Sequence, residues 1–168
     1  MTAIRDALQY YPEPLRLKKL AGNLLLMAQS GQYNYQRCLI HGEESAAQLA
    51  VCAFVKSTIN VLFLLNRQYQ PYYKWTFRAL RSLPKLSLLA ELLDYLQTTD
   101  NTPEMAEEKA SVMEGIASDV IDELMEQSLT DAICQDLEKH AYSVNDRIED
   151  GSLRNLHILA GVNEDGVL

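Results

Sequence analysis

The chain has 168 residues, a length that suits one compact domain. Hydrophobic residues make up 48% and charged residues 23%, which excludes a largely disordered chain. The net charge of −8 conceals an asymmetry. Residues 1–85 hold 11 Lys and Arg against 4 Asp and Glu, whereas residues 86–168 hold 4 against 19. The basic half also contains seven of the nine tyrosines and the only tryptophan. This predicts two surfaces with different partners, unless the acidic half neutralises the basic half inside the fold.

Cysteine and apolar patterns limit the class of protein further. Cys38, Cys52 and Cys134 are far apart, odd in number and without a C-x-x-C pair, so neither a disulfide framework nor a cysteine zinc site is expected. No apolar segment follows a basic start, so we expect no secretory signal. The longest apolar run, residues 51–65, is interrupted by polar side chains and predicts a buried core helix. We expect a cytoplasmic protein without a membrane partner.

The apolar periodicity is helical nearly everywhere, and no run alternates like a strand. We therefore predict an all-α fold, an up-and-down helical bundle of about six to eight helices. A single helical domain should cover residues 1–160, with a basic-aromatic half at 1–85 and an acidic half at 86–160, before a flexible tail at 161–168. In chain order, the predicted helices span residues 2–9, 13–40, 43–66, 72–82, 86–96, 103–127, 128–148 and 153–159.

Several helix ends carry explicit signals. Gly42 is a favoured stop for the second helix. Thr102 followed by Pro103 predicts a capping hydroxyl and a proline at the first helical position. Ser128 with Asp131 three residues on resembles a capping box, which would begin the next helix at once.

The central helix, residues 43–66, carries a polar stripe on an otherwise apolar surface. Gln48, Cys52, Lys56 and Asn60 recur every four residues. Because burial of an unpaired lysine is costly, Lys56 should face a carboxylate, water or a ligand cleft. A lysine that extends along the surface into solvent is the alternative.

A basic and aromatic segment follows, from Asn66 and Arg67 to Trp75. In the helix that begins within this segment, Lys74, Arg78 and Arg81 share one face, and Tyr73 lies on another. Such cations beside aromatic rings could hold a phosphate together with a base or sugar. A solvated face over an aromatic edge of the core is the alternative.

A third patch consists of Tyr33, Asn34, Tyr35, Arg37 and His41, in which Tyr33, Arg37 and His41 are spaced at successive helical turns. A lone histidine is more often structural than catalytic. The complete set of candidate ligand-binding residues is Tyr33, Arg37, His41, Lys56, Asn60, Asn66, Arg67, Tyr73, Lys74, Trp75 and Arg78.

Catalytic patterns are poorly represented. There is no G-x-x-x-x-G-K loop, no dinucleotide glycine fingerprint, no H-E-x-x-H and no G-x-S-x-G. Eight carboxylates crowd residues 104–126 without a histidine, which favours a solvated acidic face over a di-metal site. We therefore assign no catalytic residue, no metal ligand and no cofactor to this chain.

Two motifs of the basic half point to a known family. They are Ser30-Gly31-Gln32-Tyr33-Asn34-Tyr35-x-Arg37 and Leu65-Asn66-Arg67-x-Tyr69-x-Pro71-Tyr72-Tyr73-Lys74-Trp75, followed by Phe77-Arg78-Ala79-Leu80 and Leu83-Pro84. With them the chain resembles the domain-of-unknown-function family 4037, from about Ile4 to His157. That family is helical and often follows a polymerase-beta-like nucleotidyltransferase domain. The resemblance implies a substrate-side helical lobe, comparable to the helical domains of antibiotic and minimal nucleotidyltransferases.

One departure limits what the resemblance implies. The catalytic half of such proteins has a Gly-Ser turn followed by paired carboxylates that hold magnesium and the triphosphate. Here Gly151-Ser152 is followed by Leu153-Arg154-Asn155, and no strand is predicted nearby. The chain should therefore not transfer nucleotides unaided. Magnesium and a nucleotide are expected only together with a catalytic partner domain, in the same or a separate chain.

The leading hypothesis is a helical ligand- or substrate-binding domain of a nucleotidyltransferase-type protein that binds a phosphate-bearing or anionic ligand. One alternative is a protein–protein interaction module, which requires an exposed aromatic patch at residues 69–75. Another is a helical toxin-type ribonuclease, which needs an Arg and a His with four to six residues between them on one helix. Arg37 and His41 have three residues between them, and Arg154 and His157 have two, so neither pair fits. A nucleic-acid partner is not favoured, and a homodimer is left open.

Overall fold

The computed structural model describes residues 10–162, and every regular element within that range is a helix. The predicted all-α bundle is thereby confirmed, while the predicted helix at residues 2–9 lies outside the described range. The elements are α2 (Glu13–Met27), η1 (Ala28–Asn34), α3 (Tyr35–Ile40), α4 (Glu44–Leu65), α5 (Tyr73–Leu80), α6 (Leu89–Thr98), α7 (Pro103–Glu126), α8 (Leu137–Asp146), α9 (Gly151–Arg154) and η2 (Ile158–Gly161).

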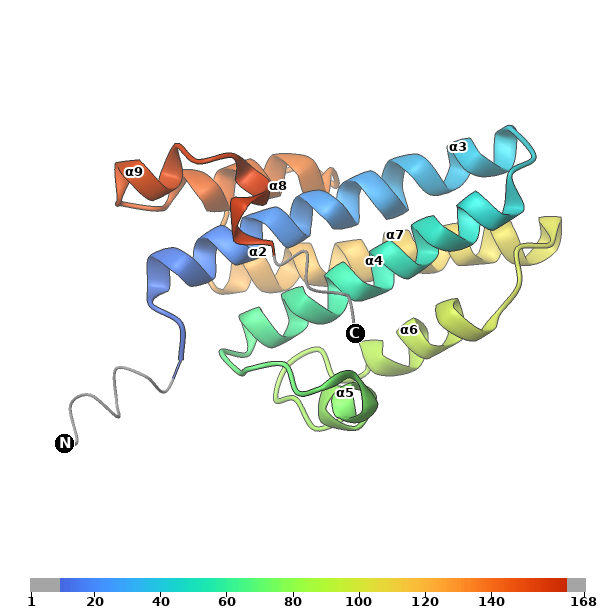
Figure 1. Ribbon diagram of the computed structural model, residues 1–168, viewed down its shortest axis with the longest axis horizontal. Helices are drawn as coiled ribbons and strands as arrows, with labels where there is room; N and C mark the ends of the chain where they lie inside the picture. Colours follow the sequence, from blue (N-terminus) through green and yellow to red (C-terminus); the bar gives the residue numbers. More distant parts are fainter. Residues whose placement is uncertain (1–9, 163–168) are drawn as a thin grey trace.

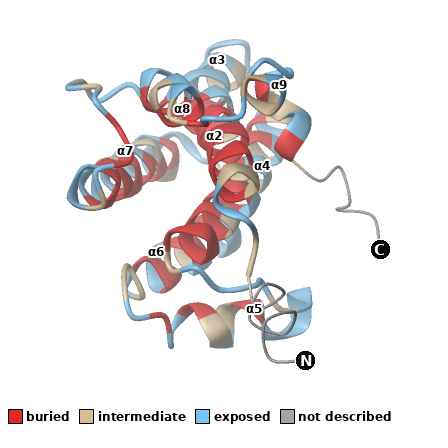
Figure 2. Cartoon of the chain, turned by 90° about the vertical axis from the view of Figure 1, so that its left-hand side faces the viewer, coloured by how far each residue is buried: buried red, intermediate tan, exposed pale blue. Residues whose placement is uncertain are grey.

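One long rod organises the bundle. Helices α2, η1 and α3 are continuous, and α4 returns beside them with α7 behind (Figure 1). Helices α8 and α9 lie on one side of the rod, whereas α5 and α6 lie on the far side of α4. The buried residues concentrate where α2, α4 and α7 meet (Figure 2). Leu24, Phe54 and Ile116 are fully buried there, one from each helix.

Helix α4 is the core helix that its apolar pattern predicted. By length and composition alone it is apolar enough to cross a bilayer, contrary to the expectation from the shorter run at residues 51–65. However, 61% of its most apolar stretch is buried inside the protein. A helix that is apolar nearly all round is expected at the centre of a bundle, where neighbours cover most of its surface.

The rod contains a π-helical segment, η1, in which the Tyr35 amide donates to the Ser30 carbonyl five residues back. At its centre, Gly31 packs directly on the ring of Phe54 in α4, and a Cβ at this position would overlap that ring. The glycine therefore permits the close approach of the rod to α4. It is buried, and the helix continues on both sides of it.

The end of α3 was predicted correctly. Gly42 adopts a φ of 71°, and the Glu43 amide donates to the Cys38 carbonyl at 2.9 Å. This left-handed turn satisfies the last carbonyls of the helix. At the start of α7, by contrast, Thr102 makes no capping bond, because its hydroxyl donates to Asp100 instead.

The prediction of a helix over residues 128–148 is wrong in its first part. Ser128 has a φ of 56°, and the Leu129 amide donates to the Leu124 carbonyl at 2.8 Å, so Ser128 ends α7 rather than capping α8. Residues 129–136 form a loop around the buried His140, whose ring nitrogens lie 2.9 Å from the Thr130 hydroxyl and 2.7 Å from the Cys134 carbonyl. Asp136 is the observed cap of α8.

The C-terminal part also differs from the predicted helix at residues 153–159. Asp150 caps the short α9 with its carboxylate, and η2 follows after a break. Gly161 is buried against the Lys18 backbone, and Val162 lies against Gly22. Residues 163–168 of the predicted tail lie outside the described range.

Candidate functional site

The eleven candidate residues do not form one site. Lys56 and Tyr73 line a common groove between α4 and α5. Lys74, Trp75 and Arg78 also lie on α5. Asn60 shares a different pocket with Lys56, between α4 and the rod. The other candidates, Tyr33, Arg37, His41, Asn66 and Arg67, lie elsewhere on the bundle.

The groove between α4 and α5, here called the basic groove, has a cavity volume of about 610 Å³. This is within the usual range of small-molecule sites. No carboxylate is among its lining residues, which are Cys52, Val55, Lys56, Ile59, Gln70, Pro71, Tyr72, Tyr73, Thr76, Phe77 and Gln97. Lys56 supplies its only formal charge at neutral pH.

Lys56, Gln70, Tyr72, Tyr73 and Gln97 of the basic groove are exposed, whereas Thr76 is buried. Lys56 is exposed and forms no ion pair with any residue from 10 to 162. The rings of Tyr72 and Tyr73 are 57% and 62% exposed, with centroids 4.4 Å apart. The Thr76 hydroxyl donates to the Pro71 carbonyl at 3.2 Å, which holds the start of α5 against the preceding loop. The groove can therefore offer a cation and two ring faces to a ligand.

Helix α5 carries two further cations. The Arg78 guanidinium lies over the ring of Trp75, 5.4 Å from its centroid, and Lys74 is exposed. Arg81, by contrast, is bound to Glu91 at 2.6 Å. The predicted stripe of three cations is therefore reduced to Lys74 and Arg78.

The third predicted patch lies on the rod, away from the basic groove. The Arg37 guanidinium covers the ring of Tyr33, with 4.9 Å to its centroid, and donates to the Tyr33 hydroxyl. His41 is exposed at the end of α3. Tyr33 contributes to a different pocket together with the acidic side chains of Glu114, Asp136 and Glu138, an arrangement that does not favour an anion.

Asn66 and Arg67 have structural roles. The Asn66 amide donates to the Lys85 carbonyl at 3.0 Å, and its oxygen accepts from the Lys85 amide at 2.9 Å. Arg67 pairs with Glu13 at 2.8 Å, and Arg16, whose side chain is 1% exposed, binds the same carboxylate at 2.7 Å. These hydrogen bonds, that from Arg16 first, lower the pKa of Glu13.

The polar stripe of α4 divides among three environments. Asn60 donates to Asn23 at 2.9 Å, while Cys52 and Lys56 face the basic groove. Gln48 belongs to a buried network around Lys109 that the sequence did not suggest. The Lys109 ammonium donates to Gln48 Oε1, the Thr99 carbonyl and Asn101 Oδ1 at 3.2, 2.8 and 2.9 Å. None of these acceptors is a carboxylate, and burial lowers the pKa of Lys109.

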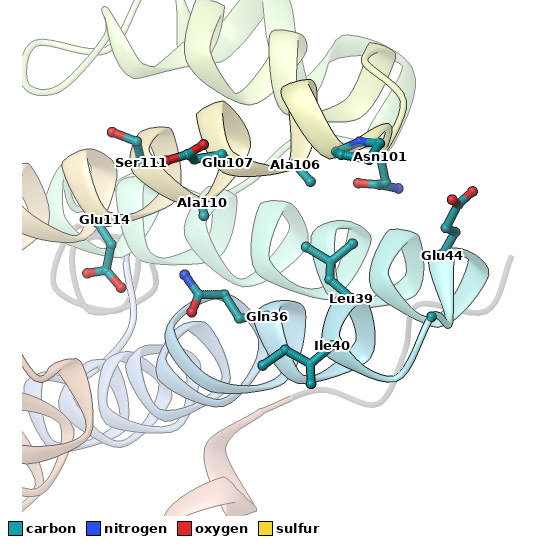
Figure 3. Close-up of a pocket in the computed structure, with 12 residues that line it drawn as sticks. Gln36, Leu39, Ile40, Glu44, Asn101, Ala106, Glu107, Ala110, Ser111 and Glu114 are labelled. Atoms are coloured by element: carbon teal, nitrogen blue, oxygen red, sulfur yellow. The ribbon is translucent and has the colours of Figure 1, made fainter.

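A second groove, between α3 and α7, was also not anticipated (Figure 3). It has a cavity volume of about 670 Å³ and carries Glu44, Glu107 and Glu114 around apolar side chains, so we call it the acid-rimmed groove. Its elements are about seventy residues apart in sequence. Only the pairing of the rod with α7 brings these residues together.

Metal chemistry finds no support in the described part of the chain. No group of three or more His, Cys, Asp or Glu side chains within residues 10–162 could hold a metal ion. Most carboxylates of α7 lie on its exposed surface, whereas Glu123 is buried and paired with Lys85 at 2.6 Å.

Comparison with known proteins yields one family. The model described as a domain of unknown function, DUF4037, matches residues 1–76, which include the motifs at residues 30–37 and 65–75. The match does not include residues 77–157, to which we had expected the resemblance to extend. No curated protein and no solved structure matches the chain. The resemblance to the DUF4037 family is therefore confirmed, and it rests on the first 76 residues.

Proposed function

We propose that this chain is a helical ligand-binding domain whose basic groove holds a phosphate-bearing or otherwise anionic ligand with a flat ring. The observation that carries the proposal is that Lys56, which forms no ion pair with any residue from 10 to 162, lines the same groove as the exposed pair Tyr72 and Tyr73. An unpaired cation in a groove without carboxylates attracts anions.

Ring stacking adds selectivity to this attraction. Exposed aromatic faces stack on bases, and each such contact is worth roughly 1–3 kcal/mol. Gln70 and Gln97 line the same groove and can donate or accept hydrogen bonds at the edge of a ring. A nucleotide combines an anionic group with a flat ring, and we propose it as the first ligand class to test.

Cys52 lines the groove, but no histidine or carboxylate that could activate its thiol is among the lining residues, so binding rather than chemistry is the proposed role. The DUF4037 resemblance supports a nucleotidyltransferase-type context, in which a separate domain would supply magnesium and its carboxylates. In that arrangement the helical domain would hold the substrate side of the reaction.

Isothermal titration calorimetry with ATP, with and without magnesium, tests the proposal. We expect Lys56→Gln and Tyr73→Ala each to weaken binding by about three- to tenfold, since each removes one charge or stacking contact. Matched controls are Lys139→Gln and Tyr142→Ala, which change an exposed lysine and an exposed tyrosine of α8. These controls should bind as the wild type does.

Two outcomes would contradict the proposal. Absence of ATP binding, both for the chain alone and after addition of a nucleotidyltransferase domain, would remove the nucleotide version. Equal losses in the α4–α5 variants and in the α8 controls would show that ATP binds no particular groove.

A second candidate function is a protein-interaction module, favoured by the aromatic surface of residues 69–75. Tyr69 is 49% exposed and Trp75 55% exposed, in addition to Tyr72 and Tyr73. Tyr69 packs on Tyr10 and Tyr11, and Tyr72 on Tyr73. Exposed aromatic side chains are enriched in protein contacts. In sedimentation experiments with a nucleotidyltransferase domain, loss of complex formation in Trp75→Ala with unchanged ATP affinity would favour this candidate.

A further inference from the structure

The acid-rimmed groove is a second, independent place for a ligand. Leu39 and Ile40 of α3 form one apolar wall, and Ala106 and Ala110 of α7 form the other. Ile40 is 80% exposed, although it belongs to an otherwise core-forming helical pattern. The small alanines leave room between the helices, so the groove is open along its length rather than filled by side chains.

The charge of this groove is opposite to that of the basic groove. Glu114 and Glu44 lie at its two ends, with Glu107 on the α7 side between them (Figure 3). No ion pair within residues 10–162 neutralises any of the three. Glu114 accepts one hydrogen bond from Gln32 Nε2 at 2.9 Å, which orients its carboxylate. No lysine or arginine is among the lining residues.

The spacing of the carboxylates suggests the shape of the ligand. Glu107 and Glu114 are seven residues apart on α7, which corresponds to about 10 Å along the helix axis. Ala110, Ser111 and Gln36 line the groove between them, whereas Leu39, Ile40 and Ala106 line it on the other side of Glu107, toward Glu44 (Figure 3). A matching ligand therefore has several cationic groups along one stem, whose alkyl part lies between Glu107 and Glu44. The carboxylates are too far apart for one metal ion, and no metal cluster exists within the described residues.

One end of the groove is held rigidly. Asn101 lines it and binds three buried or partly buried groups: its Oδ1 accepts from Lys109 and from the Tyr35 hydroxyl, each at 2.9 Å, and its Nδ2 donates to Gln48 Oε1. A residue fixed by such a network cannot easily move into the groove. The groove is therefore formed before any ligand binds.

We propose that the acid-rimmed groove binds a linear polyamine, with its protonated amines at Glu114, Glu107 and Glu44 and its methylene stem along the wall of Leu39 and Ile40 between α3 and α7. Charge complementarity attracts the amines, and the alkyl walls bury the stem. This site does not depend on the anion site proposed for the basic groove.

Calorimetry of the full chain with spermidine tests the proposal. Glu107→Gln and Glu114→Gln should each weaken spermidine binding by about two- to fivefold, as expected for loss of one exposed charge contact. Asp119→Asn is the matched control, because it removes one negative charge from the exposed surface of α7 outside the groove. It should leave the affinity unchanged.

The apolar contact has its own matched pair. Ile40→Ser should weaken spermidine binding about two- to fivefold, since it removes alkyl surface from the wall. Leu49→Ser is the control: Leu49 is 72% exposed on α4 and does not line the groove. Both residues are exposed, so neither substitution should prevent folding.

Three results would overturn the proposal. The first is no spermidine binding at millimolar concentration. The second is equal weakening by Glu107→Gln, Glu114→Gln and Asp119→Asn, which would mean general attraction to an acidic surface. The third is complete competition by magnesium chloride at equal ionic strength, because a compact dication has no stem to bury. The ATP titrations of the Lys56 variants are unaffected by any of these results.

Discussion

The basic groove and the acid-rimmed groove are almost equal in volume and opposite in charge. One lies between α4 and α5 and contains Lys56 without a carboxylate, whereas the other lies between α3 and α7 and contains three glutamates without a cation. The opposite charges of the two halves of the sequence are therefore largely kept apart. Within the described residues, ion pairs between the halves involve only Arg81 and Lys85. Neutralisation inside the fold is a minor effect.

The comparison also shows how differently the grooves are supported. The acid-rimmed groove rests on the buried Lys109 network, whereas the basic groove rests on a short helix and an exposed loop. We expect changes beneath the former to be costly for stability and changes around the latter to be tolerated. Four experiments test whether the two grooves differ in this way.

The largest effect is expected for Lys109→Met. The substitution leaves Gln48, Asn101 and the Thr99 carbonyl without their buried donor, so the free energy of unfolding should fall by about 2–4 kcal/mol. Urea unfolding measures this loss. At urea concentrations too low to unfold the variant, it should bind spermidine more weakly than the wild type and ATP with unchanged affinity.

Lys18→Met is the matched control for that experiment. Lys18 is equally buried and donates to Asn145 Oδ1 and to the Arg154 and Leu156 carbonyls at 2.9, 3.2 and 2.7 Å, far from both grooves. It should lose similar stability without any change in amine binding. An equal loss of spermidine affinity in both variants would contradict the supporting role of Lys109.

Gly31→Ala should cost about 1–3 kcal/mol, because the added methyl overlaps the Phe54 ring and forces the rod away from α4. Gly115→Ala in α7 is the control, since a Cβ there meets nothing within 4 Å and should stabilise the helix by about 0.5–1 kcal/mol. Thermal or urea unfolding of the pair measures both changes. Equal stability of the two variants would show that the contact is not tight.

Glu13→Gln should cost about 1–2 kcal/mol at pH 7, because the buried Arg16 loses its charged acceptor. The pKa of Glu13 is lowered in the folded state, so its contribution is present above the normal carboxyl pKa of 4.5 and is lost as the pH falls through the folded value. The wild type and the variant should therefore converge in acid. Unfolding at several pH values tests this.

Two further observations complete the Glu13 experiment. Glu149→Gln, a change at an exposed acid, should leave stability within about 0.5 kcal/mol. ATP affinity of Glu13→Gln should equal that of the wild type, because Arg67 belongs to this structural pair and not to the basic groove. Altered ATP affinity would reassign Arg67 to the ligand site.

The smallest effect concerns the thiol of Cys52, which lines the basic groove. Saturating ATP should slow its alkylation by iodoacetamide several-fold, while Cys38 and Cys134 react at unchanged rates. Spermidine should protect none of the three. Mass spectrometry of tryptic peptides follows each thiol separately, and protection of Cys52 by spermidine would contradict the separation of the two grooves.

Helix positions were largely predictable because apolar periodicity is a local property. The long rod, α4 and α7 were all expected within a few residues, and Gly42 marked the end of α3. The prediction that Ser128 caps a helix was wrong. A serine with an acid three residues on can precede a helix, but a serine can also adopt the left-handed turn that ends the preceding one. The choice depends on His140, whose buried ring organises the intervening loop.

The candidate site was predictable only in part. Lys56 and Tyr73 carry chemistry that their sequence neighbourhood reveals, and both line the basic groove. Asn66 and Arg67 could equally bind an anion, but Asn66 is bound to Lys85 and Arg67 to Glu13. Only folding brings these partners to them. The sequence did not predict the acid-rimmed groove. Its apolar pattern assigns Ile40 to the core, and its charge pattern assigns the glutamates of α7 to a solvated face.

The π-helical segment of the rod has a consequence for tolerance to length changes. A π turn holds one residue more than an α turn, so removing a single residue from 28–34 could leave a uniform α-helix. Side chains beyond the deletion would nearly keep their direction, because the π turn already accommodates the extra residue. Leu39 and Ile40 would still face α7. A deletion in the regular helix α4 would instead turn every later side chain by about 100° around the helix axis. The rod should therefore tolerate the loss of one codon at a place where α4 does not.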